Sequence, residues 1–218
     1  KRVREAHGIS GLLKRHGVMA RERHFVNVAD RAALLSKVPG GILHEDLESL
    51  WRGYDEMVAL EEEFRKRLVS VARRQEVMKR MEALPGVGWI RAATLYVYLD
   101  TPWRFRSKEA LWKYLGIGLE RRHSGSGPLR LKVPRHVNRV LKSTILGAAK
   151  SAVAQGANPF ADMARRWTEQ GLSPRLVRRN VARRLSATLW GLWKNGSVYH
   201  PEWVGKAAAA IPGNKESC

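Results

Sequence analysis

A seven-residue apolar repeat between residues 47 and 78 restricts the folds available to this chain more than any other feature of its sequence. Eight of the ten residues at its two repeating positions are apolar, and charged residues crowd the positions between them. The repeat consists of Leu47, Tyr54, Glu61, Leu68 and Gln75 at one position and Leu50, Met57, Phe64, Val71 and Met78 at the other. This spacing predicts one long helix, which either forms a coiled coil with a neighbouring helix or packs within its own chain.

Helical patterns also fill most of the remaining sequence, and Gly and Pro residues separate them. We therefore expect an all-α fold in which the long helix of coiled-coil type precedes a compact helical domain. The expected regions are a basic helical linker over 1–46, the long helix over 47–83, the helical domain over 84–205 and a flexible tail over 206–218. Shorter helices are expected over 1–17, 28–38, 89–99, 107–116, 135–154, 159–170 and 174–194.

The turn Pro85-Gly86-Val87-Gly88, with helices on both sides, has the sequence pattern of a helix-hairpin-helix element. Glycines in such a turn allow backbone amides to approach a phosphate, and the dipole of the following helix favours an anion. Gly86 and Gly88 are therefore predicted phosphate contacts, with Arg91 on the first turn of the second helix. A simple turn between two packed helices is the alternative.

Positive charge is concentrated in the carboxy-terminal part of the chain. The chain carries 40 Lys and Arg against 20 Asp and Glu, and residues 84–218 hold 23 basic and 7 acidic groups. A field of this sign attracts polyphosphate with an affinity that falls steeply as salt is added. We therefore expect nucleic acid as the partner. A membrane is disfavoured, because the sequence has no run of 18 apolar residues.

A Ser-Gly-Ser-Gly segment lies within the basic stretch 115–142, in which Glu120 is the only acidic residue. Ser124 and Ser126 are candidate nucleophiles, because clustered cations stabilise the charge that develops on a phosphoryl group under attack. From the residues alone, a flexible loop that only binds phosphate is the simpler interpretation. The residues predicted to contact nucleic acid in this stretch are Arg121, Arg122, His123, Arg130, Lys132, Arg135, Asn138, Arg139 and Lys142.

The sequence shows no pattern typical of a metal or disulfide site. Cys218 is the only cysteine, and the seven His are scattered without ligand spacing. We therefore expect no cofactor in this chain, and a lone cysteine fits a reducing cytoplasm. No signal peptide is visible. Because the chain lacks an initiator Met and begins within a helical pattern, we expect it to be a fragment of a longer protein.

Four blocks of the carboxy-terminal part resemble a known family. They are LPGVGWIRAATLYVYL, WRFRSKEALWKYLGIGLERRHSGSG, the segment from Arg130 to Lys142, and MARRW followed by VRRNVARRLSATLWGLWKNGSVY. In this order, over residues 84–200, they resemble the carboxy-terminal transposase domain of the bridge-RNA-guided insertion-sequence transposases, the IS-one-ten and IS-eleven-eleven class. Upstream, ISGLLKRHG and the long helix resemble the basic linker and coiled coil of that family.

The resemblance implies DNA transposition through a phosphoserine DNA intermediate. Aligning Leu115-Gly116 and Asn138 with the family pattern places the nucleophile on Ser124, with Ser126 as the alternative, although Val137 stands where a glycine is common. The family's Asp-Glu-Asp-Asp metal site belongs to an amino-terminal RNase-H-fold domain that is expected to be missing here. Mg is therefore expected only in the full-length protein, and this fragment is expected to be inactive alone.

The resemblance also implies DNA and a structured guide RNA as partners, a homo-oligomer formed through the long helix, and a bacterial protein associated with the nucleoid. Two other functions stay open at this point. One is a non-catalytic helix-hairpin-helix module that binds DNA or RNA. The other is a helical oligomerisation and RNA-binding protein in which the long helix matters most.

Overall fold

The structure, a computed structural model, describes residues 2–122, 130–132 and 137–204. Over these residues the fold is helical apart from one two-stranded ribbon, which confirms the predicted all-α class. Contacts within the chain divide it into unit 1, residues 1–67, and unit 2, residues 68–218. The boundary falls inside one long helix. The predicted division into four regions remains a prediction.

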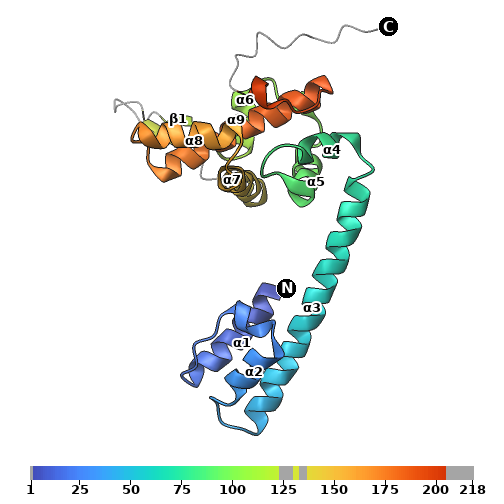
Figure 1. The fold of residues 1–218 in the computed structure, drawn as a ribbon, viewed down its shortest axis with the longest axis vertical. Coiled ribbons are helices and arrows are strands. Elements are labelled where there is room, and N and C mark those ends of the chain that lie inside the picture. Colours follow the sequence, from blue (N-terminus) through green and yellow to red (C-terminus); the bar gives the residue numbers. More distant parts are fainter. Residues whose placement is uncertain (1, 123–129, 133–136, 205–218) are drawn as a thin grey trace. The chain divides into compact units, whose positions relative to one another are not determined.

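Unit 1 is a small helical assembly around the amino-terminal part of the long helix (Figure 1). Its elements are α1 (Arg2–Arg15), the 3-10 helix η1 (Glu22–Phe25), α2 (Val28–Leu35) and most of α3 (Ile42–Ala72). Its core is apolar, and Ile9, Leu13 and Leu47 in it are fully buried. The first turns of the seven-residue repeat are therefore used within the chain itself, because Leu47 and Tyr54 pack against residues of α1 and η1.

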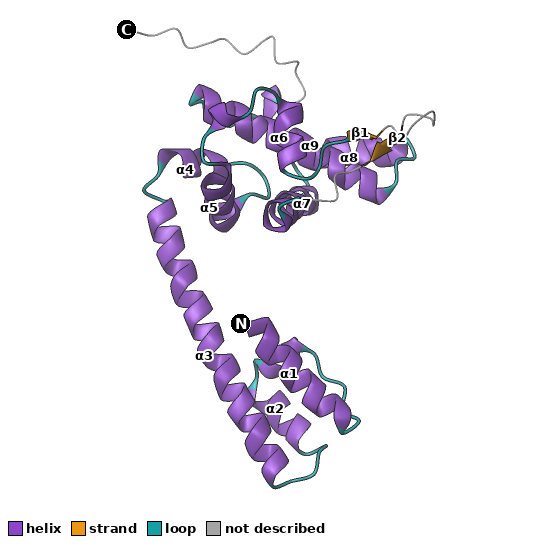
Figure 2. Cartoon of the chain, turned by 180° about the vertical axis from the view of Figure 1, so that it is seen from behind, coloured by secondary structure: helices purple, strands orange, loops and turns teal. Residues whose placement is uncertain are grey.

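Unit 2 is the larger assembly (Figure 2). Its elements after α3 are α4 (Glu76–Glu82), α5 (Gly88–Leu99), the 3-10 helix η2 (Pro102–Arg104), α6 (Lys108–Tyr114), β1 (Glu120–Arg122), β2 (Arg130–Lys132), α7 (Arg139–Ala154), α8 (Pro159–Glu169), α9 (Pro174–Asn195) and the 3-10 helix η3 (Pro201–Trp203). Helix α7 packs against α5, α8 and α9, and α9 in turn packs against α4, α6 and η2. Its small residues Ala148, Ala149 and Ala152 are fully buried, which lets neighbouring backbones approach closely.

The long helix differs in its bounds from the prediction over 47–83. It begins five residues earlier, at Ile42, and ends at Ala72, after which α4 is a separate helix with Gln75 at its N-cap. The backbone amide of Gln75 donates to the carbonyl of Ala72, which tightens the last turn. No Gly or Pro marks this break in the sequence. Packing decides it, because Ala72, Met78 and Met81 are all buried in the core of unit 2.

The middle of α3 keeps an exposed apolar stripe. Phe64 is 61% exposed and Val71 is 56% exposed, whereas Leu47, at the other repeat position near the start of the helix, is fully buried. The repeat therefore has two parts, one packed within the chain and one without an intrachain partner among the described residues. The coiled coil remains a prediction that concerns the second part only.

The turn between α4 and α5 confirms that Pro85-Gly86-Val87-Gly88 separates two helices. These helices pack against each other across the turn. Their identification as a helix-hairpin-helix element stays a prediction. None of the described helices is long and apolar enough to cross a membrane.

Candidate nucleic-acid interface

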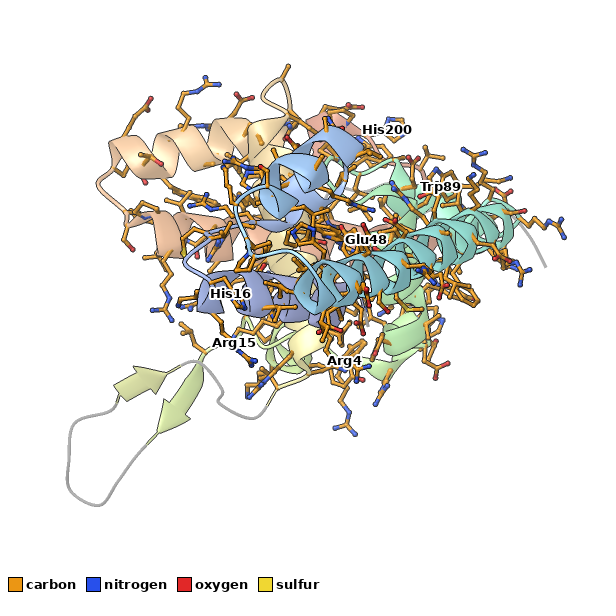
Figure 3. The ribbon with its side chains drawn as sticks, turned by 90° about the horizontal axis from the view of Figure 1, so that it is seen from below. Arg4, Arg15, His16, Glu48, Trp89 and His200 are labelled. Atoms are coloured by element: carbon orange, nitrogen blue, oxygen red, sulfur yellow. The ribbon has the colours of Figure 1, made fainter. Side chains whose placement is uncertain are left out.

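The two strands of the ribbon precede and follow the Ser-Gly-Ser-Gly segment in the sequence. Strands β1 and β2 pair antiparallel, with Glu120 opposite Lys132 and Arg122 opposite Arg130 (Figure 3). The predicted residues His123, Ser124, Ser126 and Arg135 lie outside the described residues. For Arg121, Arg122, Arg130 and Lys132 the structure describes the backbone and not the side chains. The structure does describe the two places where the ribbon joins the helices. We call these places, the end of α6 and the start of α7, the roots of the ribbon.

The first root is the end of α6. Gly116 has φ +69°, and the amides of Ile117 and Gly118 both donate to the carbonyl of Trp112, at 2.9 and 2.8 Å. A Cβ on Gly118 would lie 2.8 Å from the amide nitrogen of Lys113. The positive φ and this close approach explain why glycines stand at both positions. The chain therefore leaves α6 toward β1 in one fixed direction.

The second root is the start of α7. Asn138 accepts hydrogen bonds from the amides of Val140 and Leu141, at 3.0 and 3.1 Å, and so caps the helix. Val137, directly before it, packs against Gly116, where a Cβ would lie 2.9 Å from its side chain. The chain after α6 and the chain before α7 are therefore in contact at the two roots. Asn138, a predicted nucleic-acid contact, uses its side-chain oxygen for this cap.

Helix α9 supports the same root from the other side. The Arg183 guanidinium donates through Nε to the carbonyl of Ile117 at 2.9 Å and through Nη1 to Asn180 at 3.3 Å. The Trp112 indole donates to the carbonyl of Arg183 at 3.1 Å, and the guanidinium lies 5.9 Å from the centre of that ring. Arg183 therefore ties α9 to the segment that leads into β1.

The arginines of α9 lie close enough to affect one another. Burial lowers the pKa of Arg179, and the neighbouring charges of Arg175 and Arg178 lower it further. Burial and the charge of Arg179 likewise lower the pKa of Arg183. An opposite charge close by would raise these values instead. The described part of α9 thus presents a field of one sign.

The two glycines of the turn between α4 and α5 lie in different environments. Gly86 is buried with φ +78°, and a Cβ there would meet the carbonyl oxygen of Ala148 and, at 2.5 Å, the amide nitrogen of Ala152. Gly88 is exposed with open space around it. Gly86 therefore serves the close packing of the turn onto α7. Only Gly88 has the access that a phosphate contact requires.

Arg91 takes part in the same packing. Its Nη1 donates to the carbonyl of Gly86 at 2.5 Å and to the hydroxyl of Ser151 at 3.0 Å. Because Ser151 belongs to α7, the Arg91 guanidinium joins the glycine turn to α7. The structure therefore gives Arg91 a role in holding α5 and α7 together.

The remaining predicted contacts lie on the first turn of α7. Arg139 is exposed and Lys142 is half-buried, and this turn contains no acidic residue. The structure thus brings Asn138, Arg139 and Lys142 to the root of the ribbon, whereas Gly86 and Arg91 lie in the packing of α5 against α7. Sequence analysis missed the arginines of α9. Their spacing along one helix was the signal that could have revealed them.

The described residues do not bring together three or more His, Cys, Asp or Glu side chains in an arrangement that could hold a metal ion. Their arrangement offers cationic side chains, helix starts and a short ribbon. Cationic side chains and helix starts are groups that can bind phosphate.

Comparison with known proteins agrees with this chemistry. Residues 78–163, from α4 into α8, match the model of a family described as "Transposase IS116/IS110/IS902 family". A protein of Sinorhizobium fredii (strain NBRC 101917 / NGR234), named "Putative transposase y4pF/y4sB", is 27% identical over 205 residues, which are 91% of this chain and 52% of that protein. The chain therefore spans about half the length of the curated relative that it matches. The segment with the ribbon and its roots is the segment that is similar to the transposase family.

Proposed function

We propose that this chain is the DNA-contacting part of a transposase, an enzyme that cuts and rejoins DNA to move a segment of it. One observation carries the proposal: the family match over 78–163 contains the whole ribbon and both of its roots. The charge of the chain, +20, supports it independently, because a strongly basic surface favours a polyanionic partner.

The proposed chemistry is an exchange of phosphodiesters. The hydroxyl oxygen of Ser124 attacks a phosphorus of the DNA backbone, an Oγ–P bond forms, and one P–O bond to a sugar breaks. The serine proton passes to a base, for which His123 is the candidate, and ends on the released sugar hydroxyl. Attack by a hydroxyl of another DNA strand reverses these steps and frees the serine. Because each phosphodiester is replaced by another, no external source of energy is required.

The cations have a separate task in this proposal. Arg121, Arg122 and Arg130 belong to the ribbon and flank the segment with the two serines. Guanidinium groups there bind the non-bridging phosphate oxygens, whose negative charge grows during attack. Fixed roots at Gly116 and Asn138 support this role, since they hold the end of α6 before β1 and the start of α7 after β2 in place.

We propose that an amino-terminal domain holds the Mg and that a structured RNA selects the DNA sites. The described residues form no metal site, and no step of the serine chemistry above is assigned to a metal. The match to a protein of about twice this length supports a further domain.

A covalent adduct assay tests the catalytic proposal. The full-length protein is incubated with guide RNA and labelled DNA, and adducts that resist SDS are counted. We expect Ser124→Ala to abolish the adduct and Ser126→Ala to preserve it. Ser143→Ala, which removes an exposed hydroxyl on α7, is the matched control and should have no effect. If neither Ser124→Ala nor Ser126→Ala removes the adduct, the serine is not the nucleophile.

The alternative function is a non-catalytic module that binds DNA or RNA through the same basic surface. It predicts nucleic-acid binding without any SDS-resistant adduct in the same assay. The distinction therefore depends on the covalent product and not on affinity.

We further propose that the exposed stripe on α3 joins two copies of the chain. Phe64 and Val71 repeat at seven-residue spacing, and both are more than half exposed. Sedimentation of Phe64→Glu should show a monomer where the unaltered chain shows a dimer. Lys66→Glu, on the same helix, is the control for added negative charge. A monomeric unaltered chain would exclude this contact.

A further inference from the structure

The amino-terminal half of α9 carries five arginines, and four of them, Arg175, Arg178, Arg179 and Arg183, are called here the α9 arginine row. The row extends over slightly more than two turns, and at about 1.5 Å per residue it covers roughly 12 Å of the helix axis. The row lies outside the block matched by the family model, which ends at residue 163. No role for it follows from the family match.

None of the four guanidinium groups forms an ion pair with a carboxylate among the residues that the structure describes. The helix that precedes α9 contains two carboxylates, Asp162 and Glu169. Asp162 pairs with Arg165 at 3.2 Å, and neither carboxylate forms an ion pair with the row among the described residues. Residues 68–218 as a whole carry 27 basic and 9 acidic groups, so carboxylates are scarce in this unit. The row therefore needs its counter-charge from outside the unit.

The α9 arginine row lowers the stability of the folded unit. Arg179 and Arg183 are both partly buried, and each has its pKa lowered by burial and by a neighbouring arginine. Like charges one turn apart destabilise a helix. A cluster that weakens the fold and pairs with nothing nearby is typical of a surface that binds an anionic partner.

The start of α9 adds to the positive field. Ser173 at the N-cap forms no side-chain hydrogen bond to the helix, Pro174 occupies the first turn, and this turn contains no acidic residue. The positive end of the helix dipole therefore has no negative side chain on its own first turn. The dipole and the arginines act on an anion in the same direction.

The far end of the row is fixed to the ribbon. Arg183 donates to the carbonyl of Ile117, three residues before β1 begins. The row thus runs from the exposed start of α9 to the root from which the strands extend. The Lys108 ammonium lies 5.9 Å from the centre of the Trp112 ring, which Arg183 also approaches, and adds a further positive charge near Arg183.

We propose that the α9 arginine row binds the phosphate backbone of duplex DNA and guides it to the root of the ribbon. This inference rests on the proposed function, since it takes DNA as the substrate. One strand rises about 3.4 Å per phosphate, so the row faces roughly three or four phosphates. Arg175 and Arg178, both exposed, contact these phosphates, and Arg183 positions the row.

The test measures the affinity of the 218-residue chain for a labelled duplex DNA of arbitrary sequence, at salt concentrations from about 0.05 to 0.3 M. The variant is Arg175→Gln/Arg178→Gln, which removes two exposed charges and no hydrogen bond within the described residues. The control is Arg65→Gln/Arg67→Gln on α3, where the side chains are 64% and 70% exposed and lie beside Glu62 and Glu63. Thermal melting followed by circular dichroism confirms that both variants fold.

We expect the α9 variant to bind DNA roughly ten to sixty times more weakly at 0.1 M salt and to lose about 1.8 from its log-log salt slope. The control should stay within about twofold of the unaltered chain. Three results would overturn the inference while leaving DNA transposition intact. They are an unchanged DNA affinity of the α9 variant, a loss of affinity equal to that of the control, and a loss of affinity for duplex RNA of the same sequence without a loss for DNA. If the unaltered chain itself shows no salt-dependent DNA binding, the proposed DNA contact fails together with the inference.

Discussion

Units 1 and 2 use arginine in opposite ways. Residues 1–67 carry 13 basic and 11 acidic groups, whereas residues 68–218 carry 27 and 9. In unit 1, Arg31 forms a two-point ion pair with Asp55 at 2.6 and 2.7 Å, and Arg2 pairs with Glu61 at 2.6 Å. In unit 2, the α9 arginine row has no carboxylate partner among the described residues.

This difference separates charges that stabilise a fold from charges that serve a partner. A paired arginine contributes to the stability of its unit, and its removal weakens that unit. The unpaired, exposed members of the row lower stability until an anion binds, so their removal strengthens the unit and weakens binding. The stability of unit 2 must then come from packing.

The largest effect is expected from Gly86→Ala in unit 2. A Cβ there would overlap the α7 backbone at Ala148 and Ala152, and φ +78° is unfavourable for alanine. Overpacking and backbone strain together should lower the free energy of unfolding of unit 2 by about 3 kcal/mol. Thermal melting measures this loss. Gly88→Ala, with φ +58° and open space, is the control and should cost about 1 kcal/mol. Equal losses would show that the turn does not depend on close packing against α7.

The next effect is expected from Arg31→Gln in unit 1. This arginine joins Asp55, donates to the carbonyl of Phe25 at 2.6 Å, and lies 5.6 Å from the centre of the Trp51 ring. Because Arg31 is largely buried and Asp55 is half exposed, we expect a loss of about 1.5 kcal/mol in the stability of unit 1. DNA affinity should not change. A variant that melts normally but binds DNA weakly would reverse the contrast between the units.

A smaller effect is expected from acid. The hydrogen bonds from Arg31 lower the pKa of Asp55, which means that the folded state favours the carboxylate more than the unfolded chain does. This stabilisation is complete above the ordinary carboxyl pKa and is lost as the pH falls through the lower folded value. Melting of unit 1 between pH 5 and about pH 2 should reveal a loss below about 1 kcal/mol. In the Arg31→Gln background, this part of the pH dependence should disappear.

The smallest effect has the opposite sign. Arg178→Gln removes a charge that repels Arg179, so unit 2 should become more stable by a few tenths of a kcal/mol at low salt. Added salt should shrink this gain, because it screens the repulsion. Differential scanning calorimetry at two salt concentrations measures both quantities. A clear loss of stability would mean that Arg178 serves the fold, like the arginines of unit 1.

The sequence predicted most helices of unit 2 because their ends carry local signals. Ser107 caps α6 as expected, and Pro159 and Pro174 begin α8 and α9. The end of α3 could not be predicted in this way. Nothing local distinguishes residues 73–75 from the helix before them, and the break follows from the burial of Met78 and Met81 in a core that distant helices complete.

The candidate site was predictable only in part. The basic stretch and the two serines are visible in the sequence, whereas the role of Asn138 as a cap depends on where α7 begins, four residues after the predicted start. The role of Arg183 depends on Ile117, which lies 66 residues away in the chain. Such a contact follows from the packing of α6 against α9, and no local pattern encodes it.

Arginine modification with mass spectrometry tests the contrast between the units most directly. The chain is treated with an arginine-selective glyoxal reagent with and without duplex DNA, and the modified fraction of each arginine is measured. We predict that DNA protects Arg175 and Arg178 in unit 2, while Arg65 and Arg67 in unit 1 react equally in both samples. Protection of the unit 1 pair with no change in the α9 arginine row would contradict the assignment of DNA contact to unit 2.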